Sequence, residues 1–76
     1  MNKERRKRLQ EISGKIEDLK SEIDCISDEE QEAYDNMPES FQDSENGEQI
    51  SDNVDTLEEI VDDLDSALDG LNTLQE

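Results

Sequence analysis

Hydrophobic residues recur every three or four positions in two long segments of the chain. The first series is Leu9, Ile12, Ile16, Leu19, Ile23 and Ile26, and its register continues to Ala33 and Met37. The second series is Ile50, Val54, Leu57, Val61, Leu64, Leu68 and Leu71. Alternating steps of three and four residues place side chains on one face of an α-helix. The pattern therefore predicts two amphipathic helices, over about residues 3–36 and about residues 45–74.

The segment between the predicted helices, about residues 37–44, is rich in turn-forming residues. Pro38 should end the first helix, because the residue before a proline is disfavoured in the helical conformation. Ser44 is a good N-cap for the second helix, whose first turn contains the acidic Glu45 and Glu48. We expect Phe41 to fold back over the open end of the core.

Two helices joined by a short connection lie antiparallel. We therefore expect residues 1–76 to form a single all-α domain, an antiparallel two-helix coiled-coil hairpin. One alignment satisfies both series, pairing Met37 with Ile50, Ala33 with Val54, Ile26 with Val61, Ile23 with Leu64, Leu19 with Leu68 and Ile16 with Leu71. Glu30, opposite Leu57, is the polar residue in this predicted core.

The charges are distributed unevenly along the chain. There are 24 acidic and seven basic residues, giving a net charge of −17, and all the bases lie within the first 20 positions. An antiparallel hairpin brings these bases toward the acidic end of the second helix, with Lys20 beside Asp65. The alignment leaves residues 3–8 beyond Glu76, so a basic tip should protrude. We interpret this tip as a solubilising helix end, with a contact to a partner as the alternative.

Composition argues against several functional classes. The chain has 76 residues and no histidine, and its lone Cys25 is expected on the solvent side. A domain of this size buries little surface and lacks a nucleophile–base pair, so we expect no enzymatic activity. No EF-hand pattern fits, so neither a specific metal site nor a cofactor is predicted, with loose divalent binding to the acids as the alternative. No segment is apolar enough to span a membrane, and no signal-peptide core follows the basic start.

The acids of the second helix give the strongest functional signal. Six of them fall at outward positions: Asp52, Asp55, Glu59, Asp62, Asp63 and Asp69. Side chains three or four residues apart on a helix are separated by about 5–6 Å, which is close to the spacing of successive phosphates in a nucleic-acid strand. Such a surface favours a protein partner with a basic surface and opposes direct binding to nucleic acid or anionic lipid. A merely solvated helix face is the alternative.

A second feature of the same helix is an additional apolar stripe. Ile60, Ala67 and Leu74 lie beside the main series and widen the hydrophobic face. This stripe predicts a possible homodimer, in which two hairpins associate into a four-helix bundle.

The basic heptad start, the segment "EEQEAYDNMPESFQ" and the acidic repeats ending in "LDSALDGL" together resemble small acidic helical-hairpin proteins of bacteriophages and of prophages of Gram-positive bacteria. The resemblance covers most of the chain and carries no family activity. It implies a phage setting, in which small acidic proteins often bind and disable a host enzyme or defence complex, and hence the cytoplasm of an infected or lysogenic bacterium.

Two functions are therefore expected as alternatives. The first is a non-enzymatic, phage-encoded inhibitor of a host defence or nucleic-acid-processing protein, acting by DNA or RNA mimicry. The second is a self-associating coiled-coil scaffold or assembly protein.

Overall fold

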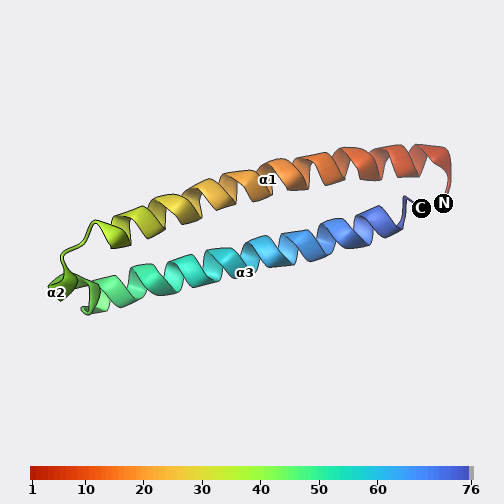
Figure 1. The fold of residues 1–76 in the computed structure, drawn as a ribbon. Helices are drawn as coiled ribbons and strands as arrows, with labels where there is room; N and C mark the ends of the chain where they lie inside the picture. Colours follow the sequence, from red (N-terminus) through yellow and green to blue (C-terminus); the bar gives the residue numbers. More distant parts are fainter. Residues whose placement is uncertain (76) are drawn as a thin grey trace.

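The computed structural model describes residues 1–75, all of whose regular structure is helical. Helix α1 spans Lys3–Asp35, the single-turn α2 spans Glu39–Gln42, and α3 spans Glu45–Thr73. Helices α1 and α3 run antiparallel and form a hairpin of 58 × 15 × 13 Å, with α2 at the closed end and the beginning of α1 beside the end of α3 at the open end (Figure 1). The all-helical hairpin predicted from the hydrophobic pattern is confirmed.

Capping residues define the beginnings of the long helices. The Asn2 side chain accepts a hydrogen bond from the Arg5 backbone N–H at 2.9 Å, and Ser44 accepts one from the Gly47 N–H at 3.4 Å. Each bond satisfies a backbone donor that has no partner within the helix. The prediction that Ser44 caps the second helix is confirmed.

The connection is closed by α2. Pro38 precedes this turn, and the Gln42 side chain donates to the backbone oxygens of Tyr34 and Met37 at 3.0 and 3.2 Å. Gly47 is buried against α2, because a Cβ at this position would lie 2.6 Å from the Phe41 oxygen. These contacts fix the angle at which the chain enters α3. Phe41 itself is 57% exposed, so the prediction that it covers the end of the core is wrong.

Helix α3 turns its predicted stripe toward α1. Val54 and Leu68 are buried, at 6% and 7% exposure, and the other members of this stripe are half-buried: Ile50, Leu57, Val61, Leu64 and Leu71. The inner face of α3 therefore follows the hydrophobic periodicity of the sequence.

Helix α1 is rotated relative to the prediction. Ile12, Leu19 and Ile26, which were expected in the core, are 44%, 52% and 48% exposed. Their place on the inner side is taken by a polar stripe one position further along the chain, consisting of Ser13, Lys20, Ser27 and Tyr34. Ser27 is buried at 8% exposure, and Lys20 donates a hydrogen bond to Asp65 of α3. The predicted pairing of Ile26, Leu19 and Ala33 with α3 core residues is therefore wrong.

Candidate functional surfaces

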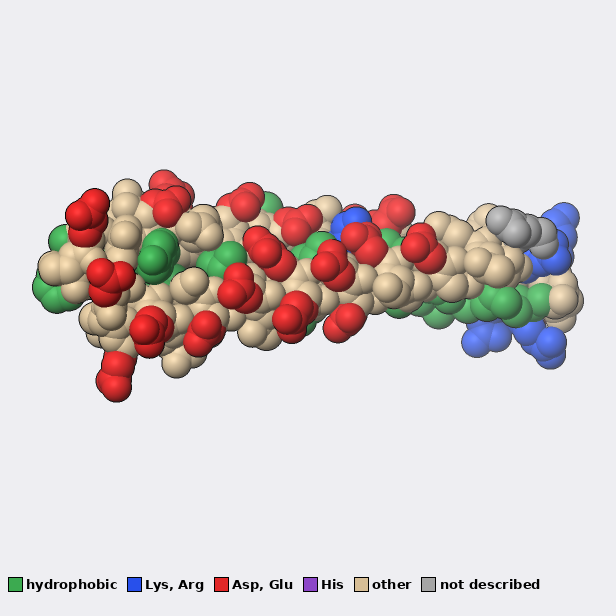
Figure 2. Space-filling view, turned by 60° about the horizontal axis from the view of Figure 1, so that its bottom comes forward, with side chains coloured by type: hydrophobic (Ala, Val, Ile, Leu, Met, Phe, Trp, Pro, Cys, Tyr) green, Lys and Arg blue, Asp and Glu red, His purple; other side chains and the backbone are tan. Residues whose placement is uncertain are grey.

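The acidic surface comprises the six predicted carboxylates of α3, Asp52, Asp55, Glu59, Asp62, Asp63 and Asp69, all of which are exposed. They lie on the side of α3 away from Val54 and Leu68, because the inner stripe occupies the opposite face of the helix. Figure 2 shows acidic side chains distributed along most of the length of the hairpin. The sequence predicted these positions from periodicity alone.

Few bases neutralise this surface. In residues 1–75 one ion pair forms between side chains, from Lys20 Nζ to Asp65 Oδ1 at 2.6 Å. The other basic side chains gather at the end of the molecule that carries the termini, apart from most of the acids (Figure 2). None of the six carboxylates of the acidic surface takes part in that ion pair, so their charges face solvent.

The Lys20–Asp65 pair lies at one edge of the helix interface. Its two side chains are 28% and 49% exposed, and they come from residues 45 positions apart in the chain. The hydrogen bond to Asp65 raises the pKa of Lys20, and the charges of Asp65, Asp24 and Glu17 act in the same direction. The pair expected from the antiparallel alignment is therefore present, and it favours the charged form of the lysine.

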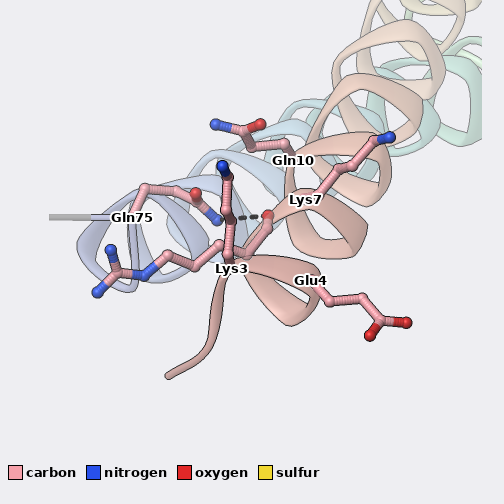
Figure 3. A pocket seen from close by; sticks show the side chains of 6 residues that line it. Lys3, Glu4, Lys7, Gln10 and Gln75 are labelled. Atoms are coloured by element: carbon pink, nitrogen blue, oxygen red, sulfur yellow. Dashed lines mark hydrogen bonds between the residues drawn. The ribbon is translucent and has the colours of Figure 1, made fainter.

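The basic end of the hairpin forms a shallow hollow. It is lined by Lys3, Glu4, Arg6, Lys7 and Gln10 of α1 and by Gln75. Gln75 Nε2 donates to the Arg6 backbone oxygen at 3.2 Å, shown as the dashed line in Figure 3. Gln75, which follows the end of α3 at Thr73, therefore contacts Arg6, and the prediction that residues 3–8 all lie beyond Glu76 is wrong for Arg6.

A third surface is hydrophobic. On α3 and its C-cap Leu74, the stripe of Ile60, Ala67 and Leu74 is exposed, with Ile60 at 38% and Leu74 at 45%. On α1, Ile12, Leu19 and Ile26 form a parallel stripe of the same length. We call these six residues the apolar side face. Figure 2 shows hydrophobic side chains in a band along one long edge of the molecule, toward its basic end.

The sequence did not predict the α1 half of this face, because the spacing of Ile12, Leu19 and Ile26 also fits a buried core stripe. The residues that directly follow these three indicate the alternative inner face of α1. Ser13, Lys20 and Ser27 recur at seven-residue intervals, which is the spacing of a second stripe that also suits the approach of α3.

In the part of the chain that the structure describes, no three His, Cys, Asp or Glu side chains lie close enough together to coordinate a metal ion. Cys25 is exposed. Among residues 1–75, no helix combines the length and hydropathy required to cross a membrane.

Comparison with known proteins does not identify a family for this chain. No protein-family description, curated protein sequence or solved structure matches the chain. The functional argument therefore depends on the charges and exposed surfaces of the hairpin itself.

Proposed function

We propose that this protein is a non-enzymatic binding module that presents the acidic surface of α3 to a basic, nucleic-acid-binding surface of another protein. The observation that supports this most directly is the exposure of six α3 carboxylates that form no ion pair with a base in residues 1–75. Opposite charges at a protein interface steer association and determine which partner fits.

The acidic surface has a spacing that suits a phosphate-binding cleft. Asp52, Asp55, Glu59 and Asp62 follow one another at intervals of three or four residues, so neighbouring carboxylates are about 5–6 Å apart. A helix also fixes these charges along a line, as a nucleic-acid backbone does. The carboxylates would occupy lysine and arginine sites that otherwise bind DNA or RNA.

The resemblance to phage-encoded hairpins gives this proposal a biological setting. In that setting the partner is a host defence or nucleic-acid-processing protein, and the encounter takes place in the cytoplasm of an infected or lysogenic bacterium. Inhibition would follow from competition, since one cleft cannot accept the helix and the nucleic acid together.

The experiment compares two variants of equal charge. In the first, Asp55→Asn, Asp62→Asn, Asp63→Asn and Asp69→Asn remove four charges from the acidic surface. In the control, Glu11→Gln, Asp18→Asn, Asp28→Asn and Glu32→Gln remove four charges from exposed positions of α1. Circular dichroism should show that both variants keep the helical hairpin, because all eight side chains are outside the core.

Capture from a Gram-positive bacterial lysate on immobilised protein then tests the proposal. The unmodified chain and the α1 control should retain a nucleic-acid-binding protein that salt or added DNA releases, whereas the α3 variant should not. Equal capture by the α3 variant, or a complex that forms on partner already loaded with DNA, would contradict phosphate mimicry.

A self-associating scaffold is the second candidate function. The exposed apolar side face favours it, because long aliphatic side chains on a surface of this kind mark interaction sites. In this role the hairpin would be an assembly unit, and recovery of only the protein itself from a lysate would support it.

A further inference from the structure

The hairpin alone buries few of its hydrophobic side chains. Within residues 1–75, only Val54 and Leu68 are buried hydrophobic residues, and no large side chain is completely buried. Leu19 and Ile26, by contrast, are each about half exposed. A larger assembly that covers these side chains would gain roughly 25 cal/mol for each Å² of apolar surface removed from water.

The two stripes of the apolar side face lie on the same side of the hairpin. Ile26 of α1 and Asn53 of α3 line one surface hollow, and Asn53 donates a hydrogen bond to Glu30 at 3.4 Å. Asn53 lies one seven-residue step before Ile60, so the stripe that continues through Ile60 is on the Ile26 side. Together the stripes therefore form one surface.

The stripes are also centred at the same level along the hairpin. Leu19 is midway between Ile12 and Ile26, and Ala67 is midway between Ile60 and Leu74. The ion pair joins Lys20, the residue after Leu19, to Asp65, which is two residues before Ala67. Leu19 and Ala67 therefore lie within about 3 Å of the same level, taking a rise of about 1.5 Å per residue.

This coincidence makes the face self-complementary. A two-fold axis across the hairpin at the level of Leu19 and Ala67 brings α1 against α1 and α3 against α3, antiparallel in both cases. Ile12 then meets Ile26 of the second copy, and Ile60 meets Leu74. Leu19 and Ala67 each meet their own counterparts.

The charges beside the face select the same arrangement. Arg8 and Lys15 flank the α1 stripe toward the termini, whereas Glu22 and Glu29 flank it toward the connection, and all four are exposed. In the antiparallel pair, Lys15 lies opposite Glu22 and Arg8 opposite Glu29. A parallel pair would instead bring the basic ends of the two copies together, so charge complementarity favours the antiparallel pair.

The flank of the α3 stripe is compatible with this pairing. Asp63 lies beside the stripe, and the same axis places it opposite Gly70 of the second copy. Gly70 is exposed, and a Cβ there would meet no atom within 4 Å in the single hairpin. A carboxylate thus faces a residue without a side chain instead of another carboxylate.

We infer that the apolar side face binds a second copy of this chain, forming an antiparallel four-helix bundle with Leu19 and Ala67 at its two-fold axis. The dimer does not depend on the proposed target of the acidic surface. Five of the six carboxylates of that surface lie off the apolar side face and remain exposed in the bundle, whereas Asp63 lies at its edge, opposite Gly70 of the second copy.

Sedimentation equilibrium of the full chain measures the assembly. In about 0.5 M salt, which screens the repulsion between two chains of charge −17, the expected mass is twice the 8.7 kDa of one chain. Leu19→Lys should give a monomer with unchanged helical circular dichroism, because Leu19 is outside the core of the hairpin. Ser21→Lys, with the same charge change at an exposed position off the face, should remain a dimer.

Cysteine cross-linking tests the position of the axis. In a Cys25→Ser background, Leu19→Cys should form a disulfide with its own copy under mild oxidation. Ile12→Cys should not, because two such residues would be about 21 Å apart, but it should cross-link in a mixture with Ile26→Cys. Asp62→Cys, on the outward surface, serves as the unreactive control.

Three results would overturn the inference. They are a monomer at every salt and protein concentration, a dimer that survives Leu19→Lys, and cross-linking of Leu19→Cys to Ala67→Cys but not to itself. Binding of the lysate target by the monomeric Leu19→Lys variant would leave the function of the acidic surface intact, so the two proposals fail separately.

Discussion

Lys20 of α1 and Asp65 of α3 form an ion pair at 2.6 Å across the hairpin. This contact joins the last basic residue of the chain to the acidic helix. It also fits the register in which Leu19 and Ala67, the centres of the two apolar stripes, lie at nearly the same height along the hairpin. The pair therefore links the charge distribution of the sequence to the geometry of the proposed dimer.

The first prediction concerns the pH dependence of this pair. The pKa of Lys20 is raised in the folded state, so the folded protein retains this proton to higher pH than the unfolded chain. The resulting stabilisation should be fully present below the unfolded lysine pKa of about 10.4 and should be lost as pH rises through the higher folded value. Urea unfolding of the wild type and of Lys20→Met between pH 8 and pH 12 should therefore converge at the alkaline end.

The matched control for this pair is a pair of carboxylate substitutions. Asp65→Asn, like Lys20→Met, should abolish the loss of stability that breaking the ion pair causes between pH 8 and pH 12. Asp28→Asn, at an exposed position of α1, should retain this loss. A pH profile of Asp65→Asn identical to that of the wild type would show that the ion pair does not contribute.

The second prediction concerns the core. Leu68→Ala should lower the free energy of unfolding by about 2–5 kcal/mol, because it removes a buried side chain from a small interior. Asp62→Ala, at an exposed position of the same helix, should change it by less than about 0.5 kcal/mol. Thermal melts that reversed this order would mean that the inner face of α3 is assigned incorrectly.

The third prediction concerns salt. Because 24 acids and seven bases leave a net charge of −17, repulsion among carboxylates should outweigh the single ion pair found in residues 1–75. Added monovalent salt at pH 7 should therefore raise the melting temperature by screening that repulsion. A melting temperature that fell with salt would indicate that attractive pairs dominate.

The fourth prediction compares two glycines. Gly14 is exposed in the interior of α1, and a Cβ there would meet nothing within 4 Å, so Gly14→Ala should stabilise the protein by about 0.5–1 kcal/mol. Gly47 packs against the Phe41 and Gln42 backbone, so Gly47→Ala should destabilise it and loosen the connection. Denaturation midpoints of the two variants should move in opposite directions, and a parallel shift would contradict the packing at Gly47.

The sequence by itself determined the helices, their direction and the inner face of α3. Pro38 and Ser44 mark the connection through local backbone chemistry, which does not require knowledge of the partner helix. The stripe containing Val54 and Leu68 has no competing polar stripe, so its burial follows from periodicity. The outward positions of the acidic surface follow from the same repeat.

Only the tertiary structure decided how α1 is rotated about its own axis. The stripe of Ile12 and Leu19 and the stripe of Ser13 and Lys20 are neighbours on the helix, and each can face α3 with the same backbone. The choice depends on contacts between side chains of the two helices, such as the one between Lys20 and Asp65, which exist only in the assembled pair. Phe41 and Gln75 were likewise unpredictable, because their positions depend on how the ends of two helices meet. Periodicity identifies which residues can be buried together, whereas packing between specific side chains selects the stripe that is buried and the one left exposed.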